Sequence, residues 1–337
     1  MRYTMLKTGK LDSQLLKDIV FKNIKFKREE VLTRPGIGED CAVIDFGEYE
    51  CVMSTDPVTA AINEIGRLAV HISCNDIASN GIEPLGIMLA VMLPVGTTEK
   101  EIEEMMRQAG EASEELGIEI IGGHTEITPA VNTPVIVSTA IGRGVKGQSQ
   151  FAKGMKPGNY ILMTKEAGIE GTGIIANDKE EKLKGFLAPE EIQKAKEMLL
   201  QVSVVKEGVI AGSVGTRGMH DITEGGILGA VWEMCQIADL GAEIWEEKIP
   251  VSQVTKKICS FFEIDYLRLI SSGCMLIIVE EAKKREIEER LKDAGIMVTS
   301  IGKIKDLESG INIIKDGKSL KIEHPEADEL YKTIDFD

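Results

Sequence analysis

Apolar segments of strand length, separated by turn residues, recur through the first half of the chain and predict a largely apolar β-sheet. Five segments share this pattern: 41–46 (CAVIDF), 50–56 (ECVMSTD), 85–93 (LGIMLAVML), 118–121 (IEII) and 134–142 (PVIVSTAIG). A short turn around Gly47 and Glu48 joins the first two segments. The nearly continuous apolar run at 85–93 is typical of a buried strand.

Two other segments of the first half have helical periodicity. Residues 63–81 place apolar side chains on one stripe and stop at Asn80-Gly81, and residues 99–116 form an acidic amphipathic pattern that stops at Gly117. The positions expected to face inward are Ile65, Leu68, Ala69, Ile72, Ile102, Met105, Met106, Ala109 and Leu116. This arrangement predicts an α+β layer with its helices on one face of the sheet.

The segment KGMKPGN (153–159) interrupts two apolar strands with Gly, Pro and Lys and predicts a domain boundary. The second half then repeats the mixed pattern. We expect strands at 160–164, 274–280 and 296–302, a glycine-rich turn at 168–173, and helices at 188–213, at 282–295 and through Ile227, Val231 and Met234. The sequence therefore predicts two α+β domains, residues 1–152 and 153–337.

Composition places the chain among soluble globular proteins. Hydrophobic residues make up 43% of its 337 residues and charged residues 28%. No run approaches the roughly 18 apolar residues of a membrane span, and the N-terminal sequence has no apolar core of a signal peptide. The six cysteines are scattered without a CxxC pair or a histidine cluster beside them, which disfavours a zinc site and favours reduced thiols. We expect a cytoplasmic protein.

Net charge narrows the range of ligands. The formal charge is −16 and no basic block offsets it, so a nucleic-acid partner is disfavoured. An anionic ligand remains compatible with the sequence, but an acidic site would need metal ions to hold it.

Three acidic residues of the first half share a setting among small and apolar neighbours. Asp40 precedes a predicted strand in GIGEDCAVID, Asp56 closes the next strand in STDPV, and Asp76 lies near a helix end in CNDIASNG. A carboxylate at the edge of a core is costly to desolvate unless a cation meets it. Each acid alone also fits a turn or a solvated surface position.

Taken together, the motifs GIGEDCAVID, STDPV, NDIASNGIEPLG, GGHTE, EGTG and HDITEGG occur in an order and spacing that resembles the AIR-synthase (PurM-like) superfamily. The similarity covers nearly the whole chain and is greatest to HypE-like hydrogenase expression/formation proteins and AIR-synthase-related proteins. It implies a two-domain PurM-like fold. The N-terminal α/β domain would bind ATP and form a barrel across a homodimer, and the C-terminal domain would be an α/β sandwich.

The resemblance also implies ATP and Mg²⁺ as cofactors, since divalent cations bridge carboxylate and phosphate oxygens. It implies nucleotide-binding roles for Lys10, Asp40, Asn75, Asp76, Gly122, Gly123, Thr125, Gly171, Thr172, Gly173 and Asp221. It implies Mg²⁺ ligands at Asp40, Asp56, Asp76 and Glu126. Lys10 and its glycine neighbour resemble a flexible arm that closes over the nucleotide, although a frayed terminus would look the same.

Several of these positions have a structural interpretation as well. His124 fits an ordinary hydrogen-bonding histidine, with Thr125 or Glu126 supplying the oxygen instead. GIEGTG alone fits a structural turn, and Asp221 and Thr223 could cap the helix that begins near Gly225. Glu224 stands where HypE relatives often carry an arginine.

The resemblance leaves three functions open. HypE proteins activate a carboxamide oxygen with ATP, and the acceptor is a cysteine in a C-terminal Pro-Arg-Ile-Cys tail. This chain instead ends ELYKTIDFD and has its last cysteine, Cys274, in a strand context. We therefore expect ATP-dependent activation of an oxygen in an unidentified small substrate, in connection with a hydrogenase-maturation partner. The alternatives are a small-molecule kinase resembling thiamine-monophosphate kinase and a non-catalytic nucleotide-binding partner in hydrogenase maturation.

Overall fold

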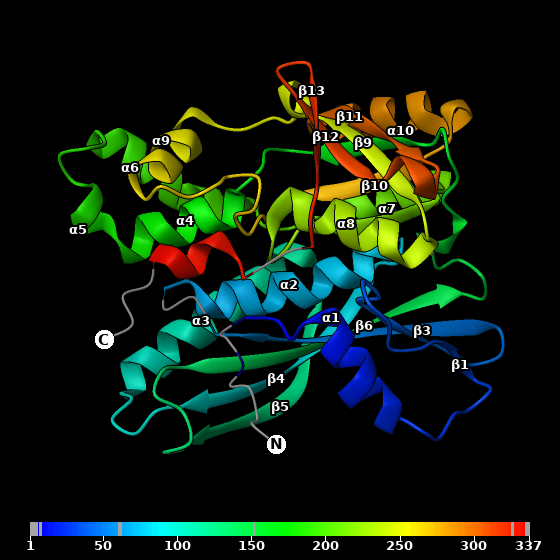
Figure 1. Ribbon diagram of the computed structural model, residues 1–337. Coiled ribbons are helices and arrows are strands. Elements are labelled where there is room, and N and C mark those ends of the chain that lie inside the picture. Colours follow the sequence, from blue (N-terminus) through cyan, green and yellow to red (C-terminus); the bar gives the residue numbers. More distant parts are fainter. Residues whose placement is uncertain (1–5, 7–8, 60–62, 151, 325–326, 334–337) are drawn as a thin grey trace, which may run out of the picture.

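The computed structural model describes residues 6, 9–59, 63–150, 152–324 and 327–333, and it contains two β-sheets with helices packed between and around them (Figure 1). The first sheet has the strand order β1-β2-β3-β6-β4-β5. Its strands are β1 (Val31–Thr33), β2 (Ala42–Asp45), β3 (Tyr49–Val58), β4 (Pro84–Leu93), β5 (Glu119–Ile127) and β6 (Val135–Val145). All neighbouring pairs are antiparallel except β4 and β5, which are parallel.

Two helices, α2 (Ile65–Ser79) and α3 (Glu99–Leu116), belong to the first sheet's unit. The α3 helix begins with a capping box between Thr98 and Glu101 and ends at Gly117, whose φ of 69° suits glycine. Every residue of α2 except Ile72 is buried. The reason is that α2 contacts the first sheet on one side and elements of the second half on the other (Figure 1).

The second sheet has the strand order β13-β12-β9-β11-β7-β10-β8. Its strands are β7 (Tyr160–Thr164), β8 (Gly218–Asp221), β9 (Gly241–Trp245), β10 (Met275–Val279), β11 (Val298–Lys305), β12 (Ile311–Lys315) and β13 (Lys318–Lys321). The α-helices outside the first unit are α1 (Ser13–Leu15), α4 (Ile169–Asp178), α5 (Glu180–Leu183), α6 (Pro189–Lys196), α7 (Val205–Val214), α8 (Gly226–Ala238), α9 (Gln253–Phe261) and α10 (Glu281–Asp293). Short 3₁₀ or π segments are Leu16–Val20, Phe21–Asn23, Ala152–Gly154, Glu197–Gln201, Glu246–Lys248, Leu307–Ser309 and Glu329–Thr333.

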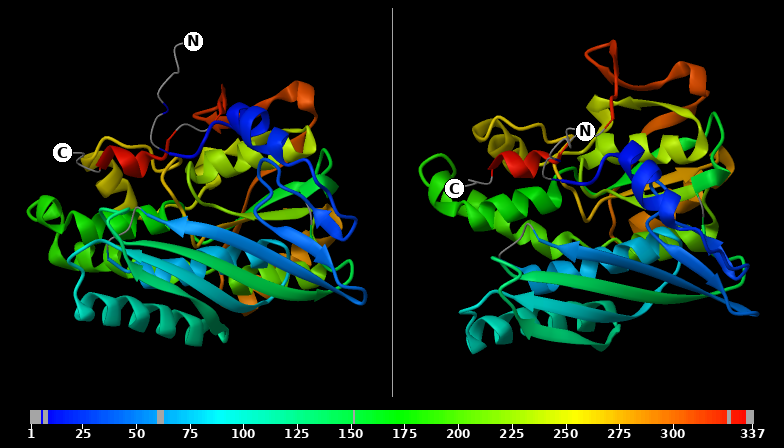
Figure 2. Two further views of the ribbon diagram at one scale, coloured as in Figure 1. Left: turned by 90° about the horizontal axis from the view of Figure 1, so that it is seen from below. Right: turned by 60° about the horizontal axis from the view of Figure 1, so that its bottom comes forward.

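One face of the first sheet is poorly covered in the single chain. Residues on β4 alternate between buried and accessible positions, and Leu85 and Met88 are 59% and 48% exposed. Figure 2 (left) shows the strands of this sheet lying in front when the molecule is seen from below. The expectation that 85–93 is a buried strand is therefore correct for only one of its faces. Such an apolar surface favours contact with another protein.

Most predicted elements of the first half are confirmed, including the two strands around Gly47 and the two helices. Two local predictions are wrong. GGHTE (122–126) lies inside β5 instead of following a strand, and GIEGTG (168–173) forms the start of α4 instead of a turn. The expected 188–213 helix is divided, because a 3₁₀ segment and residues 202–204 separate α6 from α7.

The two sheets are built from separate stretches of chain, 31–145 and 160–321. The division into domains 1–152 and 153–337 nevertheless stays a prediction, as does the dimeric barrel. No helix in the described part of the chain has the length and apolar composition needed to cross a membrane.

Candidate functional site

Asp56 and Asp76 come together through Ser54. The Ser54 hydroxyl lies 3.1 Å from Asp56 Oδ2 and 2.5 Å from Asp76 Oδ2. Ser54 and Asp56 are two residues apart on β3, so their side chains point to the same face of the sheet, where α2 presents Asp76. Packing of this helix on this strand thus joins two acids that lie 20 positions apart in the sequence.

Asp221, the last residue of β8, extends this acidic group from the second half of the chain. Its Oδ1 lies 3.5 Å from the Ser79 hydroxyl of α2, and the same hydroxyl accepts a hydrogen bond from the Asp221 amide at 3.1 Å. Asp221 Oδ2 is buried and has no hydrogen-bond partner among the residues that the structure describes. A buried carboxylate oxygen without a donor is costly, and a cation would satisfy it.

Asp40 completes a four-carboxylate cluster, which we define as Asp40, Asp56, Asp76 and Asp221. Within the described residues, Asp40, His220 and Asp221 can each offer a ligand atom, and these atoms lie within 4.8 Å of one another. Burial and the charges of Asp221, Asp56 and Asp40 raise the pKa of Asp76 well above its usual range. Burial and the charge of Asp40 raise the pKa of Asp221 to about 7. The cluster has the hard oxygen donors that Mg²⁺ prefers.

His220, which precedes Asp221 on β8, is the positive neighbour of Asp40. Its Nδ1 lies 2.7 Å from Asp40 Oδ2, and its Nε2 lies 3.0 Å from Glu233 Oε2 on α8. Burial disfavours the imidazolium, but the two carboxylates raise the pKa of His220 well above its ordinary value. We did not predict His220, Glu233 or Ser54 from the sequence. The available signal was the histidine of HDITEGG, directly before a predicted site aspartate.

Lys10 lies close to the cluster, as expected for a cation beside an acidic site. Desolvation opposes its charge, but the carboxylates of Glu233, Glu224, Asp40 and Asp56 raise the pKa of Lys10. The residue as a whole remains accessible to solvent. Of the predicted arm LKTGKLDSQ (6–14), residues 7 and 8 lie outside the described residues, and its mobility stays a prediction.

The four predicted residues on β5 are not part of this cluster within one chain. Gly122, Gly123, Thr125 and Glu126 are exposed, and Glu126 lies 3.4 Å from His124. Strands β6 and β4 separate β5 from β3, a distance of roughly 14 Å at about 4.8 Å per strand. Glu126 and Asp56 of the same chain therefore do not share one metal site, and the assignment of Glu126 as a ligand stays a prediction for a site formed between two chains.

Gly123 has a structural reason to be glycine. Its φ is 151°, and a Cβ at this position would lie 1.9 Å from the carbonyl oxygen of Leu89 on β4. The residue allows β5 to pair closely with β4 next to an irregularity in the register at Ile87 and Met88. Gly122 has a similar φ of 152° but open space around it.

The Asn75 side chain of α2 binds the backbone of the second half of the chain instead of facing a nucleotide. Its Nδ2 donates to the Val202 carbonyl at 2.8 Å and its Oδ1 accepts from the Val204 amide at 2.8 Å. The residue is completely buried. Its prediction as a cofactor-binding side chain is wrong, because its amide group is already occupied on both sides.

Gly171, Thr172 and Gly173 are buried in α4, so the expected phosphate-binding turn is also wrong. The Gly171 amide donates to the Ile270 carbonyl at 3.0 Å, and the Thr172 hydroxyl bonds to Thr255 at 3.0 Å. A Cβ on Gly171 or Gly173 would lie 2.5 Å from a leucine side chain. These glycines permit close packing of α4.

The N-terminus of α8 is capped in an unexpected way. Gly225 is the N-cap residue and no side chain of the preceding loop caps the helix, so the capping role considered for Asp221 and Thr223 is wrong. Asp328 instead accepts from the Gly225 amide at 2.7 Å. Glu224, which stands in the place of an arginine in relatives, accepts from the Tyr331 hydroxyl at 3.1 Å.

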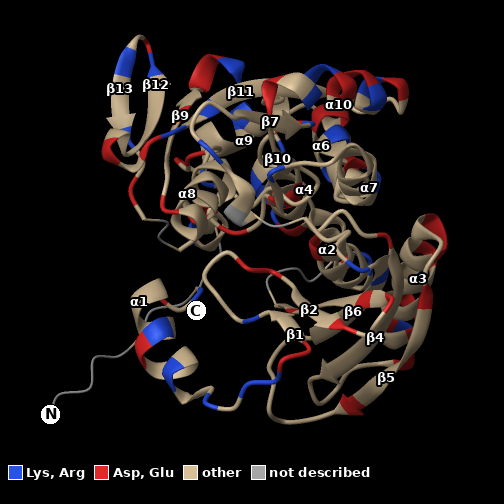
Figure 3. Ribbon diagram, turned by 90° about the vertical axis from the view of Figure 1, so that its right-hand side faces the viewer, with Lys and Arg blue, Asp and Glu red and all other residues tan. Residues whose placement is uncertain are grey.

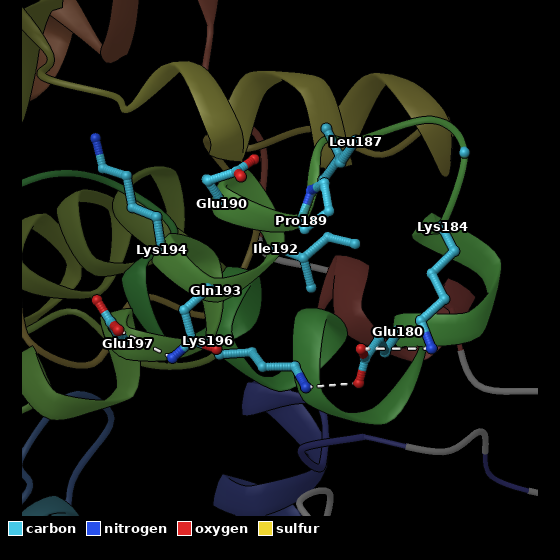
Figure 4. Close-up of a pocket in the computed structure, with 11 residues that line it drawn as sticks. Glu180, Lys184, Leu187, Pro189, Glu190, Ile192, Gln193, Lys194, Lys196 and Glu197 are labelled. Carbon is cyan, nitrogen blue, oxygen red and sulfur yellow. Dashed lines mark hydrogen bonds and ion pairs between the residues drawn. The ribbon is translucent and has the colours of Figure 1, made fainter.

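A pocket of about 930 Å³ lies away from the cluster, at α5 and α6 (Figure 4). Its charged residues largely neutralise one another: Glu180 lies 2.7 Å from Lys196 and 3.6 Å from Lys184. None of the four clustered aspartates lines it. The chemistry of the cluster, and not the volume of this pocket, therefore identifies the candidate site.

Comparison with known proteins agrees with this fold. Residues 38–144 match the N-terminal domain of AIR synthase related proteins, and residues 156–314 match the C-terminal domain. The chain belongs to the AIR synthase related family. Three of the four clustered aspartates lie in the N-terminal match and Asp221 lies in the C-terminal match, so the site joins both family domains.

Among its relatives is a Methanocaldococcus jannaschii protein whose name assigns it to hydrogenase expression/formation, 28% identical over 298 residues that cover 85% of this chain and 84% of the relative. Another is the carbamoyl dehydratase HypE of Rhizobium leguminosarum bv. viciae, 28% identical over 249 residues that cover 72% of this chain and 69% of the relative.

Solved structures share the fold at low sequence identity. HypE in a HypE–HypF complex has a TM-score of 0.75 at 22% identity and covers 92% of this chain and 99% of its own. HypE in complex with ATP has a TM-score of 0.69 at 20% identity, with 97% and 98% covered. ThiL complexed with AMPPCP and TMP has a TM-score of 0.72 at 18% identity, with 93% and 97% covered.

Proposed function

We propose that the chain is an ATP- and Mg²⁺-dependent enzyme that resembles HypE and activates an oxygen of a small substrate by phosphoryl transfer, in connection with hydrogenase maturation. The observation that carries the proposal is the four-carboxylate cluster with its unsatisfied oxygen, Asp221 Oδ2. Several carboxylates would repel a triphosphate unless a cation lay between them.

The residues we expect to hold Mg²⁺ are Asp40, Asp56, Asp76 and Asp221. Bound Mg²⁺ supplies a Lewis acid that neutralises charge on phosphate oxygens. Ser54 orients Asp56 and Asp76 by its hydroxyl, and Ser79 orients Asp221. Lys10 adds a positive charge beside the cluster, where it would attract the phosphates of a nucleotide.

Relatives support ATP and the maturation context. One relative is named for hydrogenase expression/formation, and another is a carbamoyl dehydratase HypE. A HypE structure of the same fold contains ATP, and another is a complex with HypF. We therefore propose a hydrogenase-maturation protein as partner.

The acceptor is proposed to be a small molecule that dissociates, not a cysteine of the chain. All six cysteines lie in the described part, where five are buried and Cys51 is half-buried. Cys274 is completely buried, and its thiol donates to the Glu166 carbonyl. Burial also raises the pKa of this thiol, so it is a poor nucleophile.

A small-molecule kinase is the second candidate, because ThiL with a nucleotide analogue and TMP has the same fold. The two functions differ in their product. A kinase leaves the γ-phosphoryl group in a stable product, whereas activation of an oxygen releases inorganic phosphate after a transient ester.

We further propose that two chains pair through the poorly covered face of the first sheet, as in the barrel that the family resemblance implies. This would bury Leu85 and Met88 and protect the edge strand β5. In such a dimer, the exposed Glu126 and Thr125 of one chain could complete the site of the other.

The test is calorimetric titration of ATP with and without Mg²⁺, followed by phosphorus NMR of reactions with candidate amides, carboxylates and alcohols. We expect binding that depends on Mg²⁺ and release of inorganic phosphate with a suitable acceptor. Absence of ATP binding at millimolar nucleotide would overturn the proposal. Binding without any turnover would instead favour the non-catalytic maturation partner.

A further inference from the structure

The loop that carries Asp40 is positioned by the second half of the chain. Residues 34–41 join β1 to β2 without regular structure, and the loop packs on α8. A Cβ on Gly38 would lie 2.8 Å from Ile237 Cδ1 and 3.5 Å from Glu233 Cβ. The loop therefore lies directly on the helix that presents Glu233. Figure 1 shows α8 on the side of the second half that faces the first sheet.

A buried histidine connects this helix to Asp40. His220 is 3% exposed and lies between two carboxylates, with Nδ1 2.7 Å from Asp40 and Nε2 3.0 Å from Glu233. The Nδ1 contact is an ion pair without the alignment of a hydrogen bond. The side chain of Glu233 is only 16% exposed, whereas that of Asp40 is 26% exposed. Glu233, the more buried carboxylate, thus fixes the more accessible Asp40 through His220.

We propose that Glu233, acting through His220, is a positioning residue that holds Asp40 in the orientation needed for Mg²⁺-dependent nucleotide binding. This inference rests on the proposed function, because it assigns Asp40 to the metal site. Glu233 and His220 would act on the site through Asp40 and not by contact with the nucleotide. Because both residues belong to the second half of the chain, the metal site would depend on the contact between the two halves.

The physical reason is the freedom of the loop. Gly36 and Gly38 precede Asp40 on a segment outside regular secondary structure, and Gly38 has a φ of 70°. A neutral side chain at position 233 removes the ion pair with His220 Nε2, and a charge-assisted contact is about twice as strong as a neutral one, so the ring is held less firmly against Asp40. Loss of a residue that orients a metal ligand typically weakens metal affinity by about 10- to 100-fold.

A double-mutant cycle tests whether Glu233 acts through Asp40. Affinity for Mg²⁺·ATP is measured calorimetrically for wild type, Glu233→Gln, Asp40→Asn and the double variant. We expect Glu233→Gln to weaken affinity by about 10-fold, and the double variant to bind no more weakly than Asp40→Asn alone. If Glu233→Gln weakens binding equally in both backgrounds, the proposal is wrong.

Lys10 offers a competing explanation, because its ammonium also lies near Glu233. The variant His220→Gln tells whether Glu233 acts through His220 or through Lys10, since it keeps Glu233 available to Lys10. We expect this variant to lose as much affinity as Glu233→Gln. Unchanged affinity in His220→Gln would overturn the proposal.

Glu207→Gln is the matched control. Glu207 is a buried carboxylate 2.6 Å from Lys165 and belongs to neither the cluster nor the loop. The variant Glu207→Gln should lower thermal stability while leaving Mg²⁺·ATP affinity unchanged. An equal loss of affinity in Glu207→Gln would show that general destabilisation explains the effect.

Hydrogen exchange in ligand-free protein provides a second measurement. Millisecond exchange of the peptide covering residues 34–41 should be several-fold faster in Glu233→Gln than in wild type and Glu207→Gln. If wild type does not bind Mg²⁺·ATP, the proposed function fails, but this measurement still decides whether Glu233 holds the loop. Identical exchange in all three proteins would overturn the positioning role.

Discussion

The Ser54 hydroxyl lies between two carboxylates, 2.5 Å from Asp76 Oδ2 and 3.1 Å from Asp56 Oδ2. A serine hydroxyl has one proton, so it cannot donate to both carboxylates at once. Without a cation, one acid must therefore hold a proton. The raised pKa of Asp76 identifies it as that acid, because burial and three neighbouring aspartates disfavour its charge.

Replacing Asp76 by Asn should weaken Mg²⁺-dependent ATP binding by about 10-fold or more, since the loss of one charged ligand costs on the order of 1–3 kcal/mol. Folding should survive, because without a cation Asp76 already holds a proton, and asparagine adds no charge to this group of aspartates. Titration of ATP into wild type and variant, each with and without Mg²⁺, measures the effect. Equal affinities in all four titrations would exclude the metal site.

Replacing Asn75 by Ala should lower the free energy of unfolding by about 2–6 kcal/mol, since it leaves two buried backbone groups unsatisfied at roughly 1–3 kcal/mol each. These groups are the Val202 carbonyl and the Val204 amide. Urea denaturation measures the change. Asn177→Ala is the control, because among the described residues the Asn177 side chain bonds only to the Gly173 carbonyl of its own helix. Similar losses in the two variants would contradict the role of Asn75 between the halves.

Glu170 should make stability depend on pH. Burial raises its pKa from 4.5 to about 7, so the folded protein holds a proton there that the unfolded chain releases. The contribution of Glu170 to the free energy of unfolding is therefore fully favourable below pH 4.5, and it is lost as the pH rises through about 7. Glu170→Gln should leave stability nearly unchanged at pH 4 and raise it at pH 8 by up to about 3 kcal/mol.

Denaturation of wild type and Glu170→Gln at both pH values checks this prediction. Gln can still accept the hydrogen bond that the Ser272 amide donates to Glu170 at 3.3 Å. The exposed Glu119→Gln is the control and should give no difference between the two pH values. A constant difference between wild type and Glu170→Gln at both pH values would argue against the buried neutral carboxyl.

Light scattering should show a dimer at micromolar concentration, because the apolar face of the first sheet is exposed in a single chain. Met88→Lys should give a monomer, since a charge on this face cannot be buried without a partner. Met106→Lys is a suitable control, because Met106 lies on α3 and is already 38% exposed. A monomeric wild type, or a dimeric Met88→Lys protein, would contradict pairing through this face.

The charge distribution sets the N-terminal region apart from the rest of the chain. Figure 3 shows Lys and Arg along the helical turns that follow α1 and along the segment that leads to β1, whereas α3 carries many acidic residues. Residues 9–28 contain Lys10, Lys17, Lys22, Lys25, Lys27 and Arg28. This supports the expectation that Lys10 brings positive charge to an acidic site.

Local pattern was sufficient for much of the fold. Apolar runs predicted β3, β4 and β6, and helical periodicity with Gly117 as stop predicted α3, because strand and helix signals of this length are local. The same reasoning failed at GIEGTG and GGHTE. Glycine marks places where a chain needs close approach or unusual φ, and such places occur in packed helices and in paired strands as well as in turns.

The family resemblance of the sequence motifs was enough to select Asp40, Asp56, Asp76 and Asp221 as candidate site residues, and the structure places these four acids close together. Tertiary structure alone decided their partners. Ser54 bridges two of them, His220 and Glu233 hold a third, and Glu126 is separated from them by two strands. A sequence motif shows which residue types are present, whereas the distances between residues far apart in the sequence depend on strand order and helix packing.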